Sequence, residues 1–117
     1  MNFFARNPHV AIFSVLLLIT LLAATALFAQ DGNDGERLVR EYRCYACHDM
    51  TRTLIGPPYQ AIAARHGSKK AVMTAVLARK ILLGGGGNWG MVPMVPNEHV
   101  PETDATRLAA WILNQAP

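Results

Sequence analysis

The sequence contains few of the residues from which metal-binding and reactive sites are usually built. Among its 117 residues there are only two cysteines, and no second cluster of cysteine or histidine accompanies them. The 11 basic side chains exceed the 8 acidic ones too slightly to indicate a nucleic-acid-binding protein. No segment alternates apolar and polar residues as a half-buried strand does, and no internal repeat is present. These absences argue against a zinc site, which needs about four ligands, and favour a small all-α fold.

Both cysteines belong to one pentapeptide, Cys44-Tyr45-Ala46-Cys47-His48. Two thiols at this spacing can form thioethers with the two vinyl groups of one haem, and the adjacent imidazole can then bind the iron. The competing interpretations of the two cysteines are weaker. A redox dithiol normally follows a strand in a βαβ pattern, which is missing here, and a disulfide across so short a loop would stabilise the chain little. The motif therefore predicts one covalent haem c, attached through Cys44 and Cys47, with His48 as an iron ligand.

The chain begins with a long apolar run. Arg6 is the only charged side chain among the first thirty residues, and the twenty residues from Val10 to Ala29 are almost all apolar. Ala24-Thr25-Ala26 fits the small-x-small pattern of a cleavage site, but the run is also about long enough to span a bilayer. Residues 1–29 are therefore interpreted as a signal peptide or an N-terminal membrane anchor, with residues 10–29 as the tether in the second case. Both interpretations place residues 30–117, the remaining domain, on the periplasmic side of a bacterial inner membrane.

That domain is expected to hold about four short helices. The polar run 31–35 is expected to be a linker, with Asp34 as the N-cap of a helix over residues 35–43. Further helices are expected over residues 58–65, over 69–82 with Ser68 as the cap, and from residue 101 onward. The expected inward side chains are Tyr59, Ile62 and Ala63 on the second helix, Val72, Met73, Val76, Leu77 and Ile81 on the third, and Ala105, Leu108, Trp111 and Ile112 on the last.

The stretch 84–100 has no helical or strand period, and it contains five glycines and two prolines. So long an irregular segment in a compact domain usually has a function, such as lining a ligand. A haem iron held by one histidine needs a second axial ligand, and the candidates after His48 are Met50, His66, Met73, Met91, Met94 and His99. Position in the chain disfavours all of these except Met91 and Met94. Pro93 and Pro96 stiffen the backbone around Met94, which makes Met94 the stronger candidate for the second axial ligand. Met91 remains the alternative.

Four stretches together resemble the class I c-type cytochromes, in particular the small bacterial electron carriers of the c-551 type. These stretches are the haem motif, Ile55-Gly56-Pro57-Pro58-Tyr59, Trp89-Gly90-Met91-Val92-Pro93-Met94-Val95-Pro96-Asn97, and the helix around Leu108-Ala109-Ala110-Trp111. They span nearly all of the chain after the apolar run. The resemblance implies the class I cytochrome c fold, with about four short helices wrapped around one covalently bound haem and preceded by an apolar N-terminal helix.

The resemblance also implies roles for individual residues. Met94 would be the distal iron ligand, and the Pro57 carbonyl would accept a hydrogen bond from the outer imidazole N–H of His48. Asn97 would donate a hydrogen bond near the Met94 sulfur. Trp89 would donate to a haem propionate or simply pack against the haem. Met91 and Val95 are departures, because the family often has proline at these positions.

With both axial positions filled, no substrate can coordinate to the iron. The sequence thus predicts a one-electron carrier between respiratory or related membrane-associated redox partners, and not an enzyme. The alternatives are a haem c subunit of a membrane oxidoreductase complex and a catalytic or gas-binding haem protein with an open sixth position.

A cluster of basic residues is either a solvated helix face or a docking rim for an acidic redox partner; its members are Arg65, Lys69, Lys70, Arg79 and Lys80. Because the domain is too small to bury much apolar surface alone, the apo-protein is expected to fold poorly.

Overall fold

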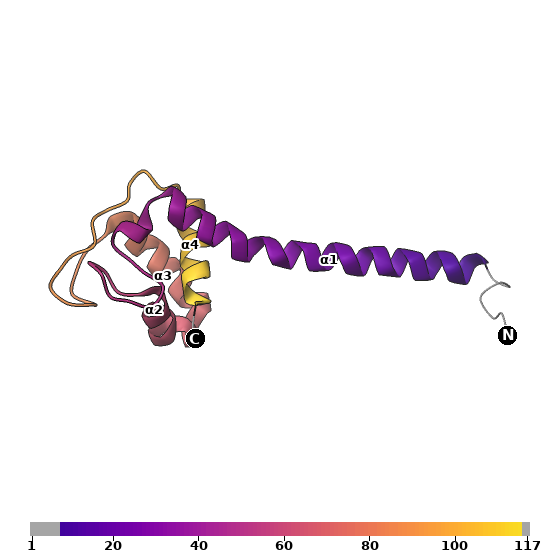
Figure 1. Cartoon of the computed structure of the whole chain (residues 1–117), viewed down its shortest axis with the longest axis horizontal. Coiled ribbons are helices and arrows are strands. Elements are labelled where there is room, and N and C mark those ends of the chain that lie inside the picture. The colour runs from indigo at the N-terminus through magenta and orange to yellow at the C-terminus, as the bar shows by residue number, and fades with distance from the viewer. Residues whose placement is uncertain (1–7, 116–117) are drawn as a thin grey trace. The chain divides into compact units, whose positions relative to one another are not determined.

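The computed structural model describes the backbone of residues 8–115 and confirms the expected all-α fold (Figure 1). Within these residues there is no strand, only an isolated antiparallel bridge between Gly85 and Met94. The helices are α1 (Pro8–Glu41), α2 (Tyr59–His66), α3 (Lys70–Leu83) and α4 (Glu102–Leu113), with single 3₁₀ turns η2 (Cys44–Ala46) and η3 (Gly67–Lys69).

The chain divides into two units between Asp31 and Gly32. The described part of the first unit is helical and belongs to α1, and its apolar side chains from Ile12 to Ile19 are exposed. Across residues 8–115, no helix combines the length and the apolar character that a membrane span requires. Arg6, the charged residue that precedes the apolar run, lies outside the described residues.

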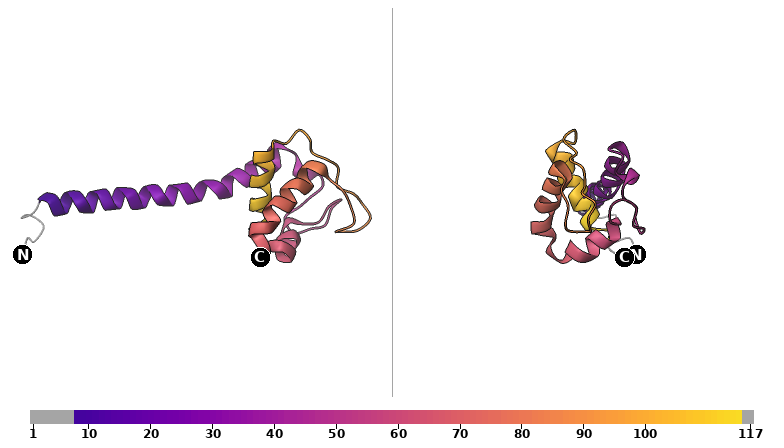
Figure 2. Two further views of the ribbon diagram at one scale, coloured as in Figure 1. Left: turned by 180° about the vertical axis from the view of Figure 1, so that it is seen from behind. Right: turned by 90° about the vertical axis from the view of Figure 1, so that its left-hand side faces the viewer.

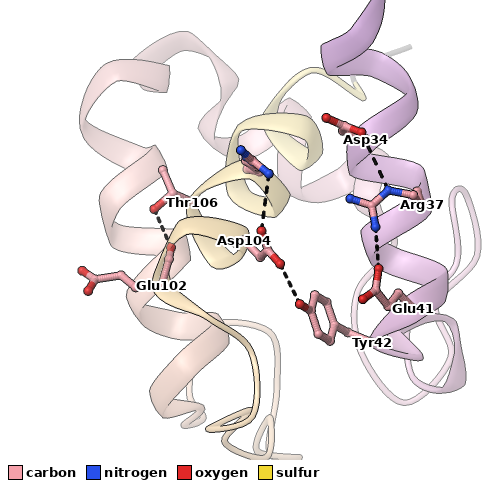
Figure 3. Close-up of polar contacts among 8 residues, drawn as sticks. Asp34, Arg37, Glu41, Tyr42, Glu102, Asp104 and Thr106 are labelled. Atoms are coloured by element: carbon pink, nitrogen blue, oxygen red, sulfur yellow. Dashed lines mark hydrogen bonds and ion pairs between the residues drawn. The ribbon is translucent and has the colours of Figure 1, made fainter.

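The linker predicted at residues 31–35 is wrong, because these residues are helical and belong to α1. Asp34 does not cap a helix there. Its carboxylate lies 3.7 Å from the Arg37 guanidinium, which also pairs with Glu41 at 2.5 Å (Figure 3). Pairs at these spacings support a helix, each by a few tenths of a kcal/mol. The helix ends at Glu41, two residues earlier than expected, since Arg43 takes a left-handed conformation with φ 57°.

The core of the second unit is one apolar cluster, to which the end of α1 and helices α2, α3 and α4 all contribute buried side chains. Leu38 and Val39 on α1 and Leu108 on α4 are at most 1% exposed. Close approach of the two helices requires Gly35, because a Cβ at this position would overlap the ring of Trp111. The Tyr42 hydroxyl, just after α1, donates to Asp104 of α4 at 2.6 Å (Figure 3). Helices α2 and α3 also pack against α4, which is therefore the central helix of this unit.

The structure confirms α2 to within one residue, and it confirms the buried faces predicted for α2 and α4. The prediction for α3 is partly wrong. Val72 and Val76 are 67% and 50% exposed, whereas Ala78 and Ile81 are buried. The cap predicted at Ser68 is also wrong, because this residue lies in η3 and the N-cap position of α3 is occupied by Lys69, without a side-chain hydrogen bond.

Two irregular segments complete the unit. One joins η2 to α2, and the other, residues 84–101, joins α3 to α4. Both extend from the same side of the helices, the left side in Figure 1 and the right side in the reverse view of Figure 2. The residues predicted to bind the cofactor lie in η2 and in these two segments.

Candidate haem site

The turn after α1 brings the two cysteines onto one short segment. The left-handed Arg43 reverses the chain, and the backbone N–H groups of Cys47 and His48 then both donate to the Cys44 carbonyl, at 3.1 and 3.0 Å. Both thiols are free and half-buried. Burial raises the pKa of the Cys44 thiol, which disfavours a reactive thiolate of the kind that a redox dithiol needs. The turn therefore offers two unpaired thiols at the spacing that thioether attachment requires.

The imidazole of His48 is held in one orientation. Its Nδ1 lies 2.7 Å from the carbonyl oxygen of Pro57, which is the contact that the resemblance implies. A carbonyl can only accept, so Nδ1 carries the proton and the lone pair remains on Nε2. The ring also stacks on Tyr59, with centroids 5.5 Å apart and planes 18° apart. The result is an imidazole whose free nitrogen has a fixed direction, as a metal ligand needs.

Gly56 makes this hydrogen bond sterically accessible, a role that sequence reasoning did not assign. A Cβ on Gly56 would overlap the His48 ring, so only glycine lets the backbone pass so close. The Gly56 N–H also donates to the Cys47 carbonyl at 2.7 Å, which ties the loop back to the haem motif. The available signal was the Gly-Pro pair itself, since a glycine before a rigid proline often marks close backbone approach.

Asp49 is a second residue that the sequence prediction missed. Its carboxylate accepts the backbone N–H groups of Thr51 and Arg52, both at 3.0 Å, and the Arg52 guanidinium at 3.2 Å. The two backbone hydrogen bonds, followed by the bonded guanidinium, hold the pKa of Asp49 well below its usual range. The signal was an aspartate two residues before the turn it closes, a common local pattern. Asp49 thus fixes the chain immediately after His48.

We call residues 84–97 the ligand loop. Its base is closed by two backbone hydrogen bonds, from the Gly85 N–H to the Met94 carbonyl at 2.9 Å and from the Met94 N–H to the Gly85 carbonyl at 3.1 Å. Met94 is half-buried and packs against the core cluster, whereas Met91 is 97% exposed. Of the two methionines that residue patterns left open, Met94 is therefore the one placed against the core.

Asn97 anchors the end of the ligand loop to α3. Its side-chain amide donates to the carbonyl oxygens of Ile81 and Val95, at 3.0 and 3.1 Å, and its backbone N–H reaches the Ile81 carbonyl at 3.2 Å. Both side-chain N–H groups are used in this way. The hydrogen bond from Asn97 to the Met94 sulfur stays a prediction, and it would require one of these two bonds to be exchanged.

Trp89 lies near the tip of the ligand loop, 42% exposed. The Arg65 guanidinium stands 4.9 Å from its ring centroid, and the His66 ring meets it edge-on at 6.4 Å. The indole is therefore held by the last turn of α2. The hydrogen bond from Trp89 to a haem propionate stays a prediction.

These residues fit a covalently bound haem. The chain supplies two free thiols on one turn, an adjacent imidazole with its Nε2 lone pair available, and a half-buried thioether on a loop that extends from the same side of the helices. Tyr59, whose ring stacks on His48, is also buried at this site. Its side chain is 2% exposed, and its hydroxyl oxygen has no hydrogen-bond partner among the described residues.

Comparison with known proteins decides the family. Residues 32–116 match the cytochrome c family. The chain is 41% identical over 76 residues to cytochrome c-551 of Allochromatium vinosum, covering 65% of this chain and 80% of that protein. It is 39% identical over 100 residues to cytochrome c-551 of Pseudomonas aeruginosa, covering 84% of this chain and 94% of that protein. The chain is a class I c-type cytochrome of the c-551 type.

The structural comparison agrees. Crystalline cytochrome c552 of Nitrosomonas europaea superposes with a TM-score of 0.65 and 39% identity, over 68% of this cytochrome and 98% of that chain. The predicted cytochrome c fold is thereby confirmed, and so is the prediction of one covalent haem c at Cys44 and Cys47. As a member of this family, the cytochrome is a small electron-transfer protein and not an enzyme.

Proposed function

We propose that this cytochrome carries single electrons by means of one haem c, with His48 and Met94 as the axial ligands, between membrane-associated redox partners in the periplasm. When bound, the haem supplies the one-electron redox centre. The observation that carries the ligand assignment is the contrast within the ligand loop. Met94 is half-buried and bonded at both backbone atoms to Gly85, whereas Met91 is exposed.

The chain's own residues then determine the redox properties. A thioether is a soft ligand that favours ferrous iron, so Met94 raises the reduction potential above that of a bis-histidine site. The hydrogen bond from His48 to Pro57 makes the imidazole more basic and fixes its plane. A ligand whose backbone N–H and carbonyl are both hydrogen-bonded, as those of Met94 are to Gly85, keeps its position in both oxidation states, which favours fast electron transfer. We place Asn97 and Trp89 in the haem environment, as supports of the Met94 loop and of a propionate.

The charge pattern supports an acidic partner. No Asp or Glu occurs from residue 50 to residue 97, a stretch that contains all five basic residues of the predicted docking rim. Three arginines outside this stretch, namely Arg37, Arg40 and Arg107, pair with carboxylates one helical turn away. Within the stretch, Arg52 pairs with Asp49, which lies just before it. On α3, by contrast, the first-turn Lys70 bonds the neutral amide of Asn114 at 2.5 Å, and Arg79 is exposed. The positive charge of this segment is therefore left to attract an acidic redox protein.

The N-terminal segment supports the proposed compartment. Residues 1–29 would direct the domain across the inner membrane as a signal peptide, or keep it at the periplasmic face as an anchor. The mass of the isolated native protein separates these outcomes, because it reports both the haem adduct and whether these residues are present. A cleaved form supports a diffusing carrier, and a retained segment supports a component fixed beside its membrane partner.

Replacement of Met94 tests the ligand assignment directly. The Met94→Ala variant is expected to lose the far-red absorption band of the ferric protein that marks methionine ligation. It should also bind carbon monoxide rapidly in the ferrous state and have a lower reduction potential. The matched control is Met91→Ala, which removes an exposed thioether from the same loop and is expected to leave all three measurements unchanged.

Two results would contradict the proposal. If Met94→Ala retained the far-red band, another residue would be the ligand. If the unmodified ferrous cytochrome bound carbon monoxide as rapidly as the Met94→Ala variant, the sixth position would be open, and a catalytic or gas-binding role would replace electron transport.

A further inference from the structure

The tip of the ligand loop is held by one charged side chain from α2. Arg65 donates from Nη1 to the Asn88 carbonyl oxygen at 2.8 Å, and its guanidinium lies 4.9 Å from the Trp89 ring centroid. We propose that Arg65 is a positioning residue for electron transfer: it clamps the loop tip so that the Met94 thioether stays on the iron. This inference rests on the proposed ligation by Met94.

The loop needs such a clamp because its own backbone is permissive. Gly84, Gly85, Gly87 and Gly90 all have positive φ angles, and the side chains of residues 85–93 are exposed. The bonds at the base of the loop, between Gly85 and Met94 and at Asn97, do not reach its tip. For residues 86–92, the hydrogen bond from Arg65 is the one that the described part of the chain supplies from outside the loop.

The chemistry of the contact calls for arginine. A guanidinium is flat, so it can stack on an aromatic ring with its face while its edge donates to a carbonyl. Arg65 makes both contacts at once, to two consecutive residues of the loop. A lysine ammonium is a point charge that can approach the indole or the carbonyl, but it lacks the planar edge that serves both together.

The position of Arg65 on α2 connects the two sides of the haem site. The first residue of this eight-residue helix, Tyr59, stacks on the His48 ring, and Arg65 near its last turn holds Trp89. Tyr59 is buried and fixes the helix in the core, where it also meets Trp111 edge-on at 5.4 Å. Helix α2 therefore contacts the His48 ring at one end and the tip of the ligand loop at the other, and it holds the two in a fixed relation.

Loss of the clamp should raise the frequency with which Met94 leaves the iron. An added ligand such as imidazole can enter the ferric protein only during such openings. The rate of imidazole binding therefore measures the loop motion, and it is independent of any redox partner.

The decisive variant is Arg65→Met, which keeps an apolar stem but removes the charge, the donor and the plane. We expect imidazole to bind about threefold to tenfold faster, as the loss of an exposed cation–π contact and a charge-assisted hydrogen bond implies. Arg65→Lys should recover only part of the slow rate. Arg79→Gln removes one positive charge from an exposed position on α3 and should bind imidazole at the unmodified rate.

Equal rates for Arg65→Met, Arg79→Gln and the unmodified protein would overturn the clamp. Trp89→Ala provides an independent test, because it should speed imidazole binding to a similar degree. In the double variant Arg65→Met, Trp89→Ala, the increase in rate should be smaller than the product of the two single increases. Fully multiplicative effects would also overturn the proposal. Haem content and far-ultraviolet circular dichroism confirm that each variant is folded.

Met94→Ala separates this inference from the proposed function. If that variant retains the ferric far-red band, Met94 is not the ligand, and both proposals fail together. If the band is lost in Met94→Ala while Arg65→Met binds imidazole at the unmodified rate, only the clamp fails and the ligand assignment stands.

Discussion

At the scale of single residues, the orientation of His48 depends on the absence of a side chain at position 56. Gly56 passes so close to His48 that a methyl group there would overlap the imidazole, while the next residue, Pro57, supplies the carbonyl that orients the ring. The Cys-x-x-Cys-His motif could be predicted because its chemistry follows from residue type and spacing, whereas the role of Pro57 was implied by the resemblance to class I cytochromes. The need for Gly56 could not be predicted, since a steric limit appears only when the loop and the ring are both placed.

Gly56→Ala should therefore destabilise the cytochrome by about 1–3 kcal/mol, because the added methyl group displaces the His48 ring or the loop. The reduction potential should change with it, since the hydrogen bond to Pro57 is strained. Thermal melting and redox titration measure the two effects. Gly67→Ala is the matched control, because Gly67 has φ −62° and a Cβ there meets its nearest neighbour at an ordinary 3.4 Å. Equal melting temperatures for the two variants would refute the steric argument.

At the scale of the helices, prediction succeeded where one face is apolar and failed where the pattern was ambiguous. The buried faces of α2 and α4 follow directly from the spacing of their apolar residues. The side chains of α3 are apolar nearly all round, so spacing could not tell that Ala78 faces the core and Val76 faces solvent. The linker prediction failed because Gly35, which normally signals a turn, is required for the close contact with Trp111.

The contact between the end of α1 and α4 has a pH dependence with a definite sign. Tyr42 donates to Asp104, and this hydrogen bond, together with smaller effects of desolvation and nearby carboxylates, raises the pKa of Tyr42 to about 12 (Figure 3). The unfolded chain releases the same proton near pH 10. The folded state thus holds the proton more tightly, so the stabilisation is complete below about pH 10 and is lost as the pH rises toward about 12.

Tyr42→Phe should lower the free energy of unfolding at neutral pH and make it less sensitive to pH between about 10 and 12. Denaturant titrations of both proteins at several pH values test this, because subtracting the two curves removes the contributions of the other tyrosines. Arg107, which pairs with the other oxygen of Asp104 at 3.6 Å, stays in place in this variant. A difference between the curves that does not vary with pH would mean that the hydroxyl is not held as a donor.

At the scale of the whole molecule, the domain is small, and the residues that would hold the haem lie at the edge of its core. Its buried side chains gather around α4, while the haem motif, Met50 and Met94 lie only partly buried at the edge of this cluster. A domain of this size buries too little apolar surface to be stable alone by a wide margin. We therefore expect the folded state to depend on the apolar surface that a covalently bound haem would supply.

The Cys44→Ala, Cys47→Ala double variant should therefore lose much of its helical circular dichroism at room temperature, because it cannot retain haem covalently. The single variant Cys47→Ala is a graded control that can keep one thioether and should retain more structure. Native helicity in the double variant without haem would show that the core of α1, α2 and α4 is sufficient by itself.

The left-handed backbone at Arg43 has a consequence for how this protein could adapt. A residue with a Cβ pays roughly 1–2 kcal/mol for that conformation, whereas glycine and, to a lesser degree, asparagine adopt it readily. The strained position adjoins Cys44 but contributes no atom to the coordination of iron. In a lineage moving into a hotter habitat, replacement of Arg43 by glycine or asparagine would therefore raise the melting temperature of the protein and leave its redox chemistry untouched.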